Sequence, residues 1–411
     1  MPQSLRRQAT LLRSAPGFRL LFVATLGSSL GTWMATIALT VDVQRRTHSP
    51  WWISAVWLAT LLPTVVIGLG AGPLVDRLPR KRLLVSADLV RLGVFAVLPF
   101  VDRAVSIVVL AGVAGVANSF FRPAVLAGVP NLVGPEDLSY GTSMLQTADW
   151  AATALGPVLA GSIVGASGPH LVYWINAGTF LFSACLILRI SAGFLQSEQG
   201  ITRGHWRDLR EGVGEFARSR PLLTALLALG FAVLATGFVN VSEIFLATRS
   251  LHSGPVGYGL LWTSSGVGLV VGSVIVGGFI ERRPPLALYP WLFLPWGLGL
   301  VGAAVAPTIG LAAAAMVVAG FGNGLTFPVT VVIVQQAASD RVRGRVFAAI
   351  ISIHNALLGL SYVAGGWLTK DFGARWAYGG ASVLLFAGAL TAFGLTRNVA
   401  TGVRLRREQA A

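Results

Sequence analysis

Three ionisable residues lie inside long apolar stretches of the sequence, where charge is otherwise rare. Asp149 falls within the apolar stretch 141–165, Glu243 lies near the end of the stretch 222–248, and His354 lies within 345–369. If such a stretch crosses a lipid bilayer, a carboxylate near its middle costs about 2.5–3.5 kcal/mol. A carboxyl or imidazole group kept there therefore needs a reason. The chemistry that these groups offer is the reversible binding of a proton.

Two of the three residues are related by an internal repeat. A shift of 205 residues, half the length of the chain, places Asp149 on His354. The same ungapped shift matches several other pairs: Pro16 and Pro221, Gly72 and Gly277, Asp76 and Glu281, Arg77 and Arg282, Asn118 and Asn323, Pro123 and Pro328, Gly161 and Gly366. Such a pattern indicates a duplicated unit. In a membrane chain, two similar halves predict a transport site on the axis between them.

We therefore predict that Asp149 and His354 form a proton-sensitive centre, each influencing the protonation of the other. In the simpler alternative, each residue forms a hydrogen bond to a neighbouring helix. Glu243, nearer the outer face, is a further candidate for proton coupling, although it could also reach interface water. Asp88 and Arg91 are spaced i, i+3 in another apolar stretch, so we expect them to neutralise each other.

The elements that must position these residues are membrane-spanning helices. Hydrophobic residues make up 54% of the 411-residue chain and charged residues 11%, with a mean hydropathy of +0.72. We predict an all-α membrane protein of about twelve transmembrane helices in two pseudo-symmetric six-helix bundles. The expected spans, each close to the roughly 20 residues that a bilayer requires, lie near 18–42, 51–75, 83–101, 104–128, 141–165, 171–190, 222–248, 256–280, 286–306, 309–336, 345–369 and 376–396.

The expected domains follow from these spans. Residues 1–191 form the first bundle, 221–396 the second, and 397–411 a basic cytoplasmic tail. Between the bundles, residues 192–220 are polar, with Trp206, Leu209, Val213 and Phe216 at helical spacing. This spacing predicts an amphipathic helix at the cytoplasmic membrane surface that links the two halves.

The net charge of +15 is distributed as membrane topology requires. With both termini in the cytoplasm, most arginines fall in inside segments, as the positive-inside rule predicts. The excess charge then serves orientation and attraction to anionic membrane lipid, and we expect no nucleic-acid partner. Arginine far outnumbers lysine, which suggests a GC-rich bacterial genome and hence a bacterial plasma membrane.

The loop after the second span has the sequence Gly72-Pro-Leu-Val-Asp76-Arg77-Leu-Pro79-Arg80-Lys81. It resembles the signature loop of the major facilitator superfamily, Gly-x-Leu-x-Asp-Arg-x-Gly-Arg-Lys, with Pro79 in place of glycine. The second half carries a repeated copy at 277–284 that includes Glu281 and Arg282. The resemblance implies that these loops act as cytoplasmic latches, in which Asp76 engages the positive start of a helix in the other half. Arg122 could pair with Asp76 in one conformation only, or have a purely structural partner.

Two further stretches resemble a narrower branch, the secretion-effector or macrolide- and enterobactin-efflux type. They are Phe120 to Gly161 and Asp340 to Phe347. Within the first, Gly156-Pro157-x-x-Ala160-Gly161 resembles the fifth-helix antiporter signature of exporters, with Ala160 in place of glycine. The fourth-helix arginine typical of drug/proton antiporters is missing, because Ala111 lies near its expected position. This departure counts against proton antiport by the usual route.

The polarity of the expected cavity indicates the substrate. Its candidate lining is mostly neutral: Trp33, Asn118, Gln146, Asn240, Asn323 and Asn355, with further aromatic surface from Trp57, Trp150 and Trp262. A few polar groups in an apolar cleft suit a sizeable amphipathic molecule better than a sugar or an inorganic anion.

Enzymatic alternatives lack their motifs. There is no phosphate-binding G-x-x-x-x-G-K-[ST] loop. Gly27-Ser-Ser29-Leu-Gly31 matches G-x-S-x-G, but it lies inside an apolar span rather than at a strand-to-helix turn, which favours helix packing. We expect no enzyme, no metal and no cofactor, but a monomeric exporter of amphipathic molecules driven by the proton gradient through alternating access. A proton-independent facilitator or lipid carrier, and a non-transporting receptor or scaffold, remain alternatives.

Overall fold

The chain is helical throughout the part that the structure describes. A computed structural model describes residues 3–70, 79–191, 213–216 and 218–408. Within these ranges, twelve helices are long and apolar enough to cross a membrane, which confirms the predicted fold class. Helices are expected here because no water in the bilayer core can satisfy backbone groups, so each span must form its hydrogen bonds internally.

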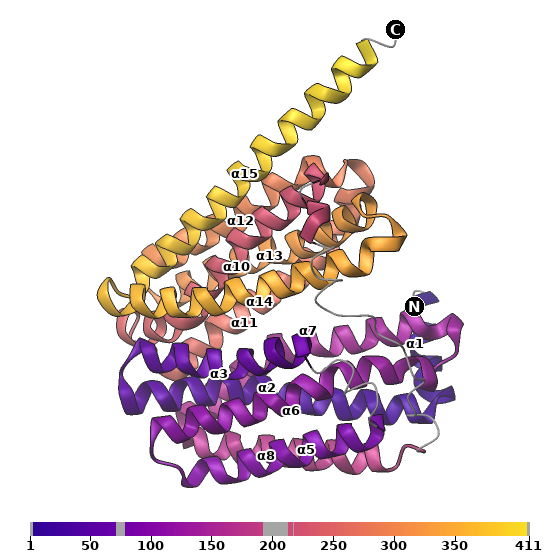
Figure 1. Ribbon diagram of the computed structural model, residues 1–411. Helices are drawn as coiled ribbons and strands as arrows, with labels where there is room; N and C mark the ends of the chain where they lie inside the picture. Colours follow the sequence, from indigo (N-terminus) through magenta and orange to yellow (C-terminus); the bar gives the residue numbers. More distant parts are fainter. Residues whose placement is uncertain (1–2, 71–78, 192–212, 217, 409–411) are drawn as a thin grey trace. The chain divides into compact units, whose positions relative to one another are not determined.

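The helices divide into two compact units, each described separately. Unit 1 comprises residues up to Thr202 together with Gly254–Thr263. Its helices lie side by side in Figure 1, with α2 packed on α7 and α8, and α5 on α6 and α8. The helices of unit 1 are α1 (Gln3–Ser14), α2 (Pro16–Thr47), α3 (Pro50–Gly70), α5 (Arg80–Val97), α6 (Ala104–Leu132), α7 (Leu138–Ser167) and α8 (Pro169–Leu188), with short 3-10 turns η1 (Leu98–Phe100) and η2 (Pro135–Asp137).

Unit 2 comprises residues from Arg203 to Ser253 and from Ser264 onward. In it, α10 packs on α14 and α15, and α12 packs on α13 and α15. Its helices are α10 (Arg220–Phe245), the π-helical turn η4 (Leu246–Ser250), most of α11 (Gly254–Arg282), α12 (Pro285–Val305), α13 (Ile309–Ala337), α14 (Asp340–Asp371) and α15 (Ala374–Glu408).

Turns that are 205 residues apart have the same geometry. Gly168 ends α7 with a φ of +82°, and Gly373 follows α14 with a φ of +91°. Glycine adopts this left-handed backbone without the steric cost of a side chain. The amide of Gly168 donates to the carbonyl of Val164, and that of Gly373 donates to the carbonyl of Thr369. The repeat seen in the sequence is therefore a repeat of backbone geometry.

Helix packing repeats with the same shift. In unit 1, a Cβ atom on Gly115 of α6 would lie 3.0 Å from the carbonyl oxygen of Thr60 in α3. In unit 2, a Cβ atom on Gly320 of α13 would overlap the carbonyl oxygen of Ser265 in α11. Small residues at such crossings let helices approach to backbone contact, which substitutes for the hydrophobic drive that lipid does not supply.

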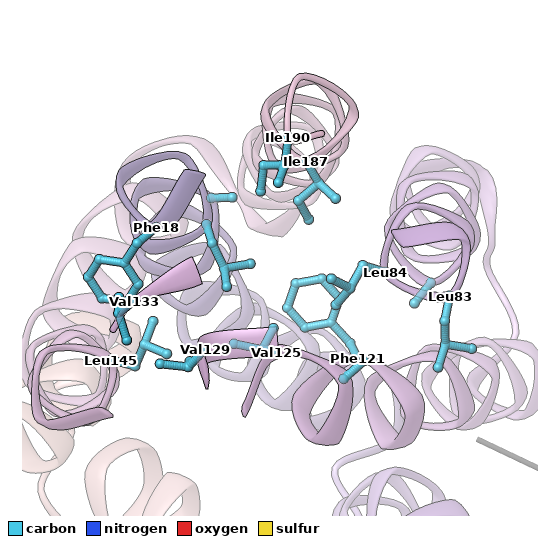
Figure 2. Packing of buried hydrophobic residues seen from close by; sticks show 14 of the residues in the cluster. Phe18, Leu83, Leu84, Phe121, Val125, Val129, Val133, Leu145, Ile187 and Ile190 are labelled. Carbon is cyan, nitrogen blue, oxygen red and sulfur yellow. The ribbon is translucent and has the colours of Figure 1, made fainter. Parts of the chain in front are cut away.

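One end of unit 1 has an apolar core to which six helices contribute, namely α1, α2, α5, α6, α7 and α8 (Figure 2). Phe18 from α2, Leu84 from α5 and Phe121 from α6 converge there and are almost fully buried. Leu11 places α1 on the same cluster. This core fixes the ends of the helices that carry the site described below.

The expected linker and tail are only partly described. Val213–Phe216 are helical and Phe216 is buried in a core cluster of unit 2 with Leu222 and Val346. Trp206 and Leu209 lie outside the described residues. The segment 397–408 is the continuation of α15.

Candidate functional site

Unit 1 contains a cavity of about 230 Å³. Its wall is formed by α2, α3, α5, α6 and α7. Among the lining residues are Trp33, Asn118 and Gln146, which the sequence analysis predicted to contact the substrate. The remaining lining residues are Thr25, Ser28, Ser29, Thr32, Thr36, Trp57, Arg91, Phe121, Arg122, Val125, Leu126, Thr142, Leu145 and Asp149. Apolar and hydroxyl groups thus surround a small number of charges.

Asp149 is positioned by two partners from other helices. Ser29 of α2 donates its hydroxyl to Oδ1 of Asp149 at 2.7 Å. Nη2 of Arg122, on α6, lies 2.9 Å from Oδ2. The side chain of Asp149 is 21% exposed and that of Arg122 is 61% exposed. The pair therefore borders the open space of the cavity, where its charges can be rearranged by protonation or by a ligand.

Arg122 pairs with Asp149, a partner that the sequence analysis did not name. The predicted partner, Asp76, lies outside the described residues, so that pairing stays a prediction. The described partner is Asp149. A pairing between α6 and α7 inside the cavity wall was not foreseen, because nothing in the sequence shows which faces of these helices meet.

A stripe of hydroxyl groups on α2 was also not singled out from the sequence. Thr25, Ser28, Thr32 and Thr36 are spaced by three or four residues, so they share one helix face. Thr32 and Thr36 each donate to the carbonyl four residues earlier, at 2.7 and 2.9 Å. Because their protons are used within the helix, their lone pairs remain as acceptors toward the cavity. The helical spacing of these residues was the signal that could have revealed the stripe.

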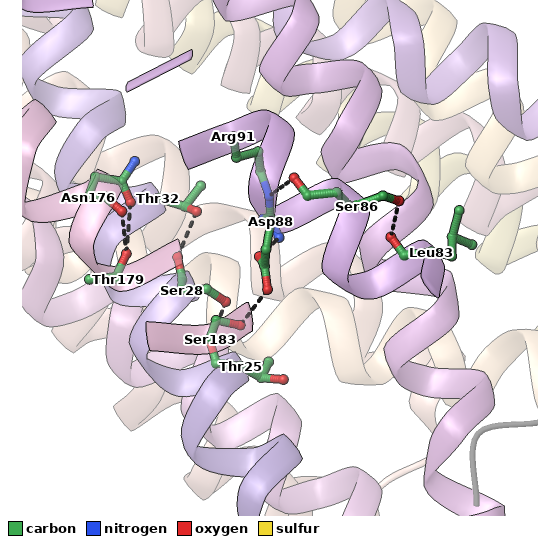
Figure 3. Close-up of polar contacts among 11 residues, drawn as sticks. Thr25, Ser28, Thr32, Leu83, Ser86, Asp88, Arg91, Asn176, Thr179 and Ser183 are labelled. Carbon is green, nitrogen blue, oxygen red and sulfur yellow. Dashed lines mark hydrogen bonds and ion pairs between the residues drawn. The ribbon is translucent and has the colours of Figure 1, made fainter. Parts of the chain in front are cut away.

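The predicted pair of Asp88 and Arg91 is confirmed and lies beside the cavity (Figure 3). Nη2 of Arg91 lies 2.5 Å from Oδ1 of Asp88, and Ser183 of α8 donates to Oδ2 at 2.7 Å. The guanidinium carbon of Arg91 lies 4.1 Å from the ring centre of Phe121 and 4.3 Å from that of Phe180. Cation–π contacts and an ion pair thus fix the guanidinium in one orientation.

Three tryptophans form a cluster at the cavity. Trp57 and Trp262 are stacked with ring centres 6.0 Å apart, and Trp33 lies 5.6 Å from Trp262. Trp262 comes from the segment 254–263 of α11, which belongs to unit 1. Such rings offer broad apolar surface to a ligand.

The fifth-helix motif brings α7 close to its neighbours. A Cβ atom on Gly156 would lie 2.8 Å from Cβ of Trp33, and one on Gly161 would lie 2.6 Å from the carbonyl oxygen of Pro255. Pro157 is buried within the same helix. Only glycine permits these approaches, so the motif sets the position of Trp33 relative to α7.

The remaining candidates lie in unit 2. Glu243 is buried at 2% exposure, and its Oε1 has no hydrogen-bond partner among the described residues. His354, Asn323 and Asn355 are partly buried in α13 and α14. Nδ2 of Asn240 donates to the hydroxyl of Tyr362 at 3.4 Å. The expected meeting of Asp149 with His354 stays a prediction.

The latch residues are described in part. Gly72, Asp76 and Arg77 lie outside the described residues. Arg80 donates to the carbonyl of Ala127 at 2.8 Å, and Nζ of Lys81 donates to the carbonyls of Leu188 and Ile190 at 2.7 and 2.5 Å. These two basic residues thus bind the ends of α6 and α8 within unit 1. In unit 2, Glu281 and Arg282 are exposed at the end of α11.

The serine of the G-x-S-x-G sequence lies in the middle of α2, as the sequence predicted. A Cβ atom on Gly31 would overlap side-chain oxygens of Asn176 and Thr179 on α8. The glycine therefore serves helix packing, and no strand-to-helix elbow exists at this serine.

Comparisons with known proteins agree with this architecture. Residues 11–401 match a family model described as transmembrane secretion effector. The MFS-type transporter YfiS of Bacillus subtilis is 27% identical over 383 residues, covering 90% of both chains. The multidrug efflux pump Tap of Mycobacterium tuberculosis is 28% identical over 382 residues, covering 87% of this chain and 88% of Tap. A crystal structure of a bacterial homologue of the iron transporter ferroportin superimposes with a TM-score of 0.76 at 13% identity, covering 92% of this chain and 98% of that one.

Proposed function

Because this chain belongs to the transmembrane secretion effector family of major facilitator transporters, we propose that it exports amphipathic small molecules in exchange for protons. Transport across a membrane, rather than catalysis, is the activity of the family. The proposal concerns the coupling ion, the kind of substrate and the direction of transport.

The ion pair of Asp149 and Arg122 in the cavity wall carries the proposal. A carboxylate in a membrane-spanning helix is costly unless it is used or neutralised. Here it is neutralised by an arginine that is itself largely exposed to open space. Binding of a proton to Asp149 removes the charge that holds Arg122, whereas loss of the proton restores it. The pair can therefore exist in two arrangements, selected by protonation.

Alternating access supplies the rest of the proposed cycle. In one state the cavity binds the substrate from the cytoplasm, with Asp149 ionised. In the other state Asp149 takes up a proton from outside, and the substrate leaves. The proposed relay groups of unit 2 are His354, related to Asp149 by the repeat, and Glu243, whose buried Oε1 has no hydrogen-bond partner in the described part of the chain. We place both termini in the cytoplasm, as the arginine distribution indicates.

The driving force suffices for such a cycle. Moving one proton through 100 mV yields about 2.3 kcal/mol, and each pH unit adds about 1.4 kcal/mol. One proton per cycle then supports a substrate gradient of a few hundredfold, at about 1.4 kcal/mol per decade.

The lining of the cavity supports an amphipathic substrate. Tryptophan, phenylalanine and leucine side chains alternate there with hydroxyls and two amides, an arrangement typical of drug-sized ligands. The relative Tap is named as a multidrug efflux pump, which agrees with this substrate class.

The proposal can be tested in everted membrane vesicles from a host that lacks its own efflux pumps. Ethidium movement is followed while a pH gradient is imposed. We expect Asp149→Asn and His354→Gln to lose at least about 10-fold in the proton-driven rate, since a required charge transfer worth more than about 1.4 kcal/mol is removed. Asp102→Asn is the matched control, because Asp102 is 96% exposed at the surface of the same unit. Full coupling to the pH gradient in both variants would exclude the proposed centre.

The alternatives give different results in the same vesicles. A facilitator or lipid carrier is indifferent to a protonophore, whereas the proposed exporter stops. A receptor or scaffold produces no flux above that of empty vesicles under any gradient.

A further inference from the structure

The polar cluster of Asp88, Arg91 and Ser183 has an apolar counterpart in the other unit. A shift of 205 residues places Phe293 on Asp88, Trp296 on Arg91 and Gly388 on Ser183. Phe293 and Trp296 are buried in α12. A Cβ atom on Gly388 would lie 3.7 Å from a ring carbon of Phe293, so Gly388 faces Phe293 as Ser183 faces Asp88. Equivalent positions therefore lie together in both units, but they are polar in unit 1 and apolar in unit 2.

The fold of a unit does not require an ion pair at the positions of Asp88 and Arg91. Unit 2 fills these positions with two aromatic rings. Buried ion pairs contribute little net stability, because desolvation offsets their attraction, and apolar replacements of similar size are often neutral or stabilising. Keeping Asp88 and Arg91 in a membrane-spanning helix is thus better explained by a role in binding than by packing.

Arg91 is held with one group left over. Nη2 binds Asp88 and Nε donates to the carbonyl of Ala87 at 3.3 Å. The Nη1 group takes no part in these two contacts, and the side chain is only 4% exposed. Arg91 and its stacking partner Phe121 both line the cavity. A guanidinium held in one orientation therefore borders the cavity beside an aromatic ring.

The charge balance indicates which kind of ligand group can accept a hydrogen bond from Arg91. Asp88 neutralises Arg91, so the pair offers a strong hydrogen-bond donor without net charge. A neutral oxygen acceptor gains the hydrogen bond without forming a second ion pair. The hydroxyl stripe on α2 does the opposite, since Thr32 and Thr36 use their protons within the helix and present acceptors.

We propose that Arg91 is a substrate-binding residue that donates a hydrogen bond to a carbonyl or amide oxygen of the transported molecule, with Phe121 covering an adjoining apolar part. This inference rests on the proposed export function for its biological meaning, but it concerns binding and can be tested without transport. It divides candidate substrates into those with a carbonyl group and those without one.

The test introduces the apolar residues of unit 2 at the equivalent positions of unit 1. The triple variant Asp88→Phe, Arg91→Trp and Ser183→Gly copies the residues of unit 2. Two probes are used: tetracycline, which carries carbonyl and amide oxygens, and ethidium, which contains no oxygen. Binding to the purified full-length protein is measured by titration calorimetry in detergent. We expect tetracycline binding to weaken by about 10- to 100-fold, as the loss of a hydrogen bond to a charged donor implies, while ethidium binding changes less than about threefold.

A second variant keeps the test decisive if the triple variant does not give a monodisperse protein. Asp88→Asn with Arg91→Gln removes both charges at similar volume and can retain the contact between the two side chains. We expect it to weaken tetracycline binding and to leave ethidium binding unchanged. Equal tetracycline binding by the wild type and the folded variant overturns the inference, as does an equal loss for both probes or an absence of tetracycline binding by the wild type. Failure of the export proposal is separate, since it would appear as intact binding without proton-driven flux.

Discussion

Nη2 of Arg122 lies 2.9 Å from Oδ2 of Asp149, and this contact joins α6 to α7 across the wall of the cavity. Ser29 of α2 completes the arrangement with a 2.7 Å hydrogen bond to the other oxygen. Three helices therefore meet at one carboxylate. We expect a change in the charge of that carboxylate to alter the contacts between all three, which would link proton binding to helix movement.

Two substitutions of Arg122 distinguish the contribution of its charge from that of its planar guanidinium group. We expect Arg122→Gln to lower proton-driven ethidium efflux by about 10- to 100-fold, because a hydrogen bond between charged groups contributes about 1.5–3 kcal/mol. Arg122→Lys should retain part of the rate, since it keeps the charge without the planar fork. Initial rates in everted vesicles measure both. If Arg122→Gln transports as fast as the wild type, the ion pair has no part in coupling.

Removing the hydroxyl of Ser29 tests the second partner of Asp149. Ser29→Ala deletes one hydrogen bond to the carboxylate but leaves Arg122 in place. We expect a loss of roughly threefold to tenfold in efflux rate, smaller than that of Arg122→Gln, because a single hydroxyl bond contributes about 0.5–1.5 kcal/mol. Thr142→Ala is the matched control, since Thr142 also lines the cavity but donates to the carbonyl of Leu138. Equal losses in both variants would assign the effect to the cavity surface and not to Asp149.

Gly320 tests the backbone contact between α11 and α13. A methyl group at this position would overlap the carbonyl oxygen of Ser265, so Gly320→Ala should destabilise unit 2 by about 1–3 kcal/mol, the usual cost of overpacking. Gly310→Ala, in the first turn of the same helix, meets nothing within 4 Å and should be neutral or stabilise by about 0.5–1 kcal/mol. Thermal unfolding in detergent compares the two. A melting temperature for Gly320→Ala at or above that of Gly310→Ala would contradict the packing described here.

The fold was largely predictable from the sequence, because the membrane imposes simple rules. Each span needs a long apolar stretch, and the repeat is marked by residues with strict backbone roles. Gly168 and Gly373 illustrate the point, since a left-handed backbone favours glycine in both halves. The pairing of Asp88 with Arg91 was predictable for the same reason, because neighbours in sequence on one helix must meet.

A site residue could be predicted only where its type and its position along an apolar stretch were enough to identify it. Asp149 was identified as an unusual charge in an apolar stretch, but its partners Ser29 and Arg122 come from helices distant in sequence. Which faces of α2, α6 and α7 meet depends on close approaches such as that of Gly156 to Trp33. A spacing pattern cannot show these approaches. The opening of Arg91 to the cavity was missed for the same reason.

Lys81 tests whether the signature loop also has a structural role. Its ammonium group donates to the carbonyls of Leu188 and Ile190 at the C-terminal end of α8. A positive charge at this end of a helix interacts favourably with the helix dipole. We expect Lys81→Met to lower the free energy of unfolding by about 0.5–2 kcal/mol, a range that combines the dipole contribution with the loss of hydrogen bonds to a charged group. Arg82→Met, at the exposed neighbouring position, is the control. An unchanged melting temperature combined with lost transport would instead assign Lys81 to the latch alone.

The first helix contacts unit 1 through charged contacts of Arg7 that can be changed without touching the cavity. Arg7 pairs with Asp137 and, at a longer distance of 3.7 Å, with Glu136. Nε of Arg7 lies 2.8 Å from Oδ1 of Asp137, and this hydrogen bond raises the pKa of the Arg7 guanidinium, so the arginine stays charged at any physiological pH. Leu11 of the same helix is buried in the core of unit 1. We expect Asp137→Asn to increase backbone hydrogen exchange in residues 7–14 by roughly twofold to fivefold, because exposed ion pairs contribute little, about 0.2–1 kcal/mol. Leu11→Ala should have a larger effect, since it removes about 2–5 kcal/mol of packing. If Asp137→Asn loosens α1 more than Leu11→Ala does, the apolar contact is not the main anchor of this helix.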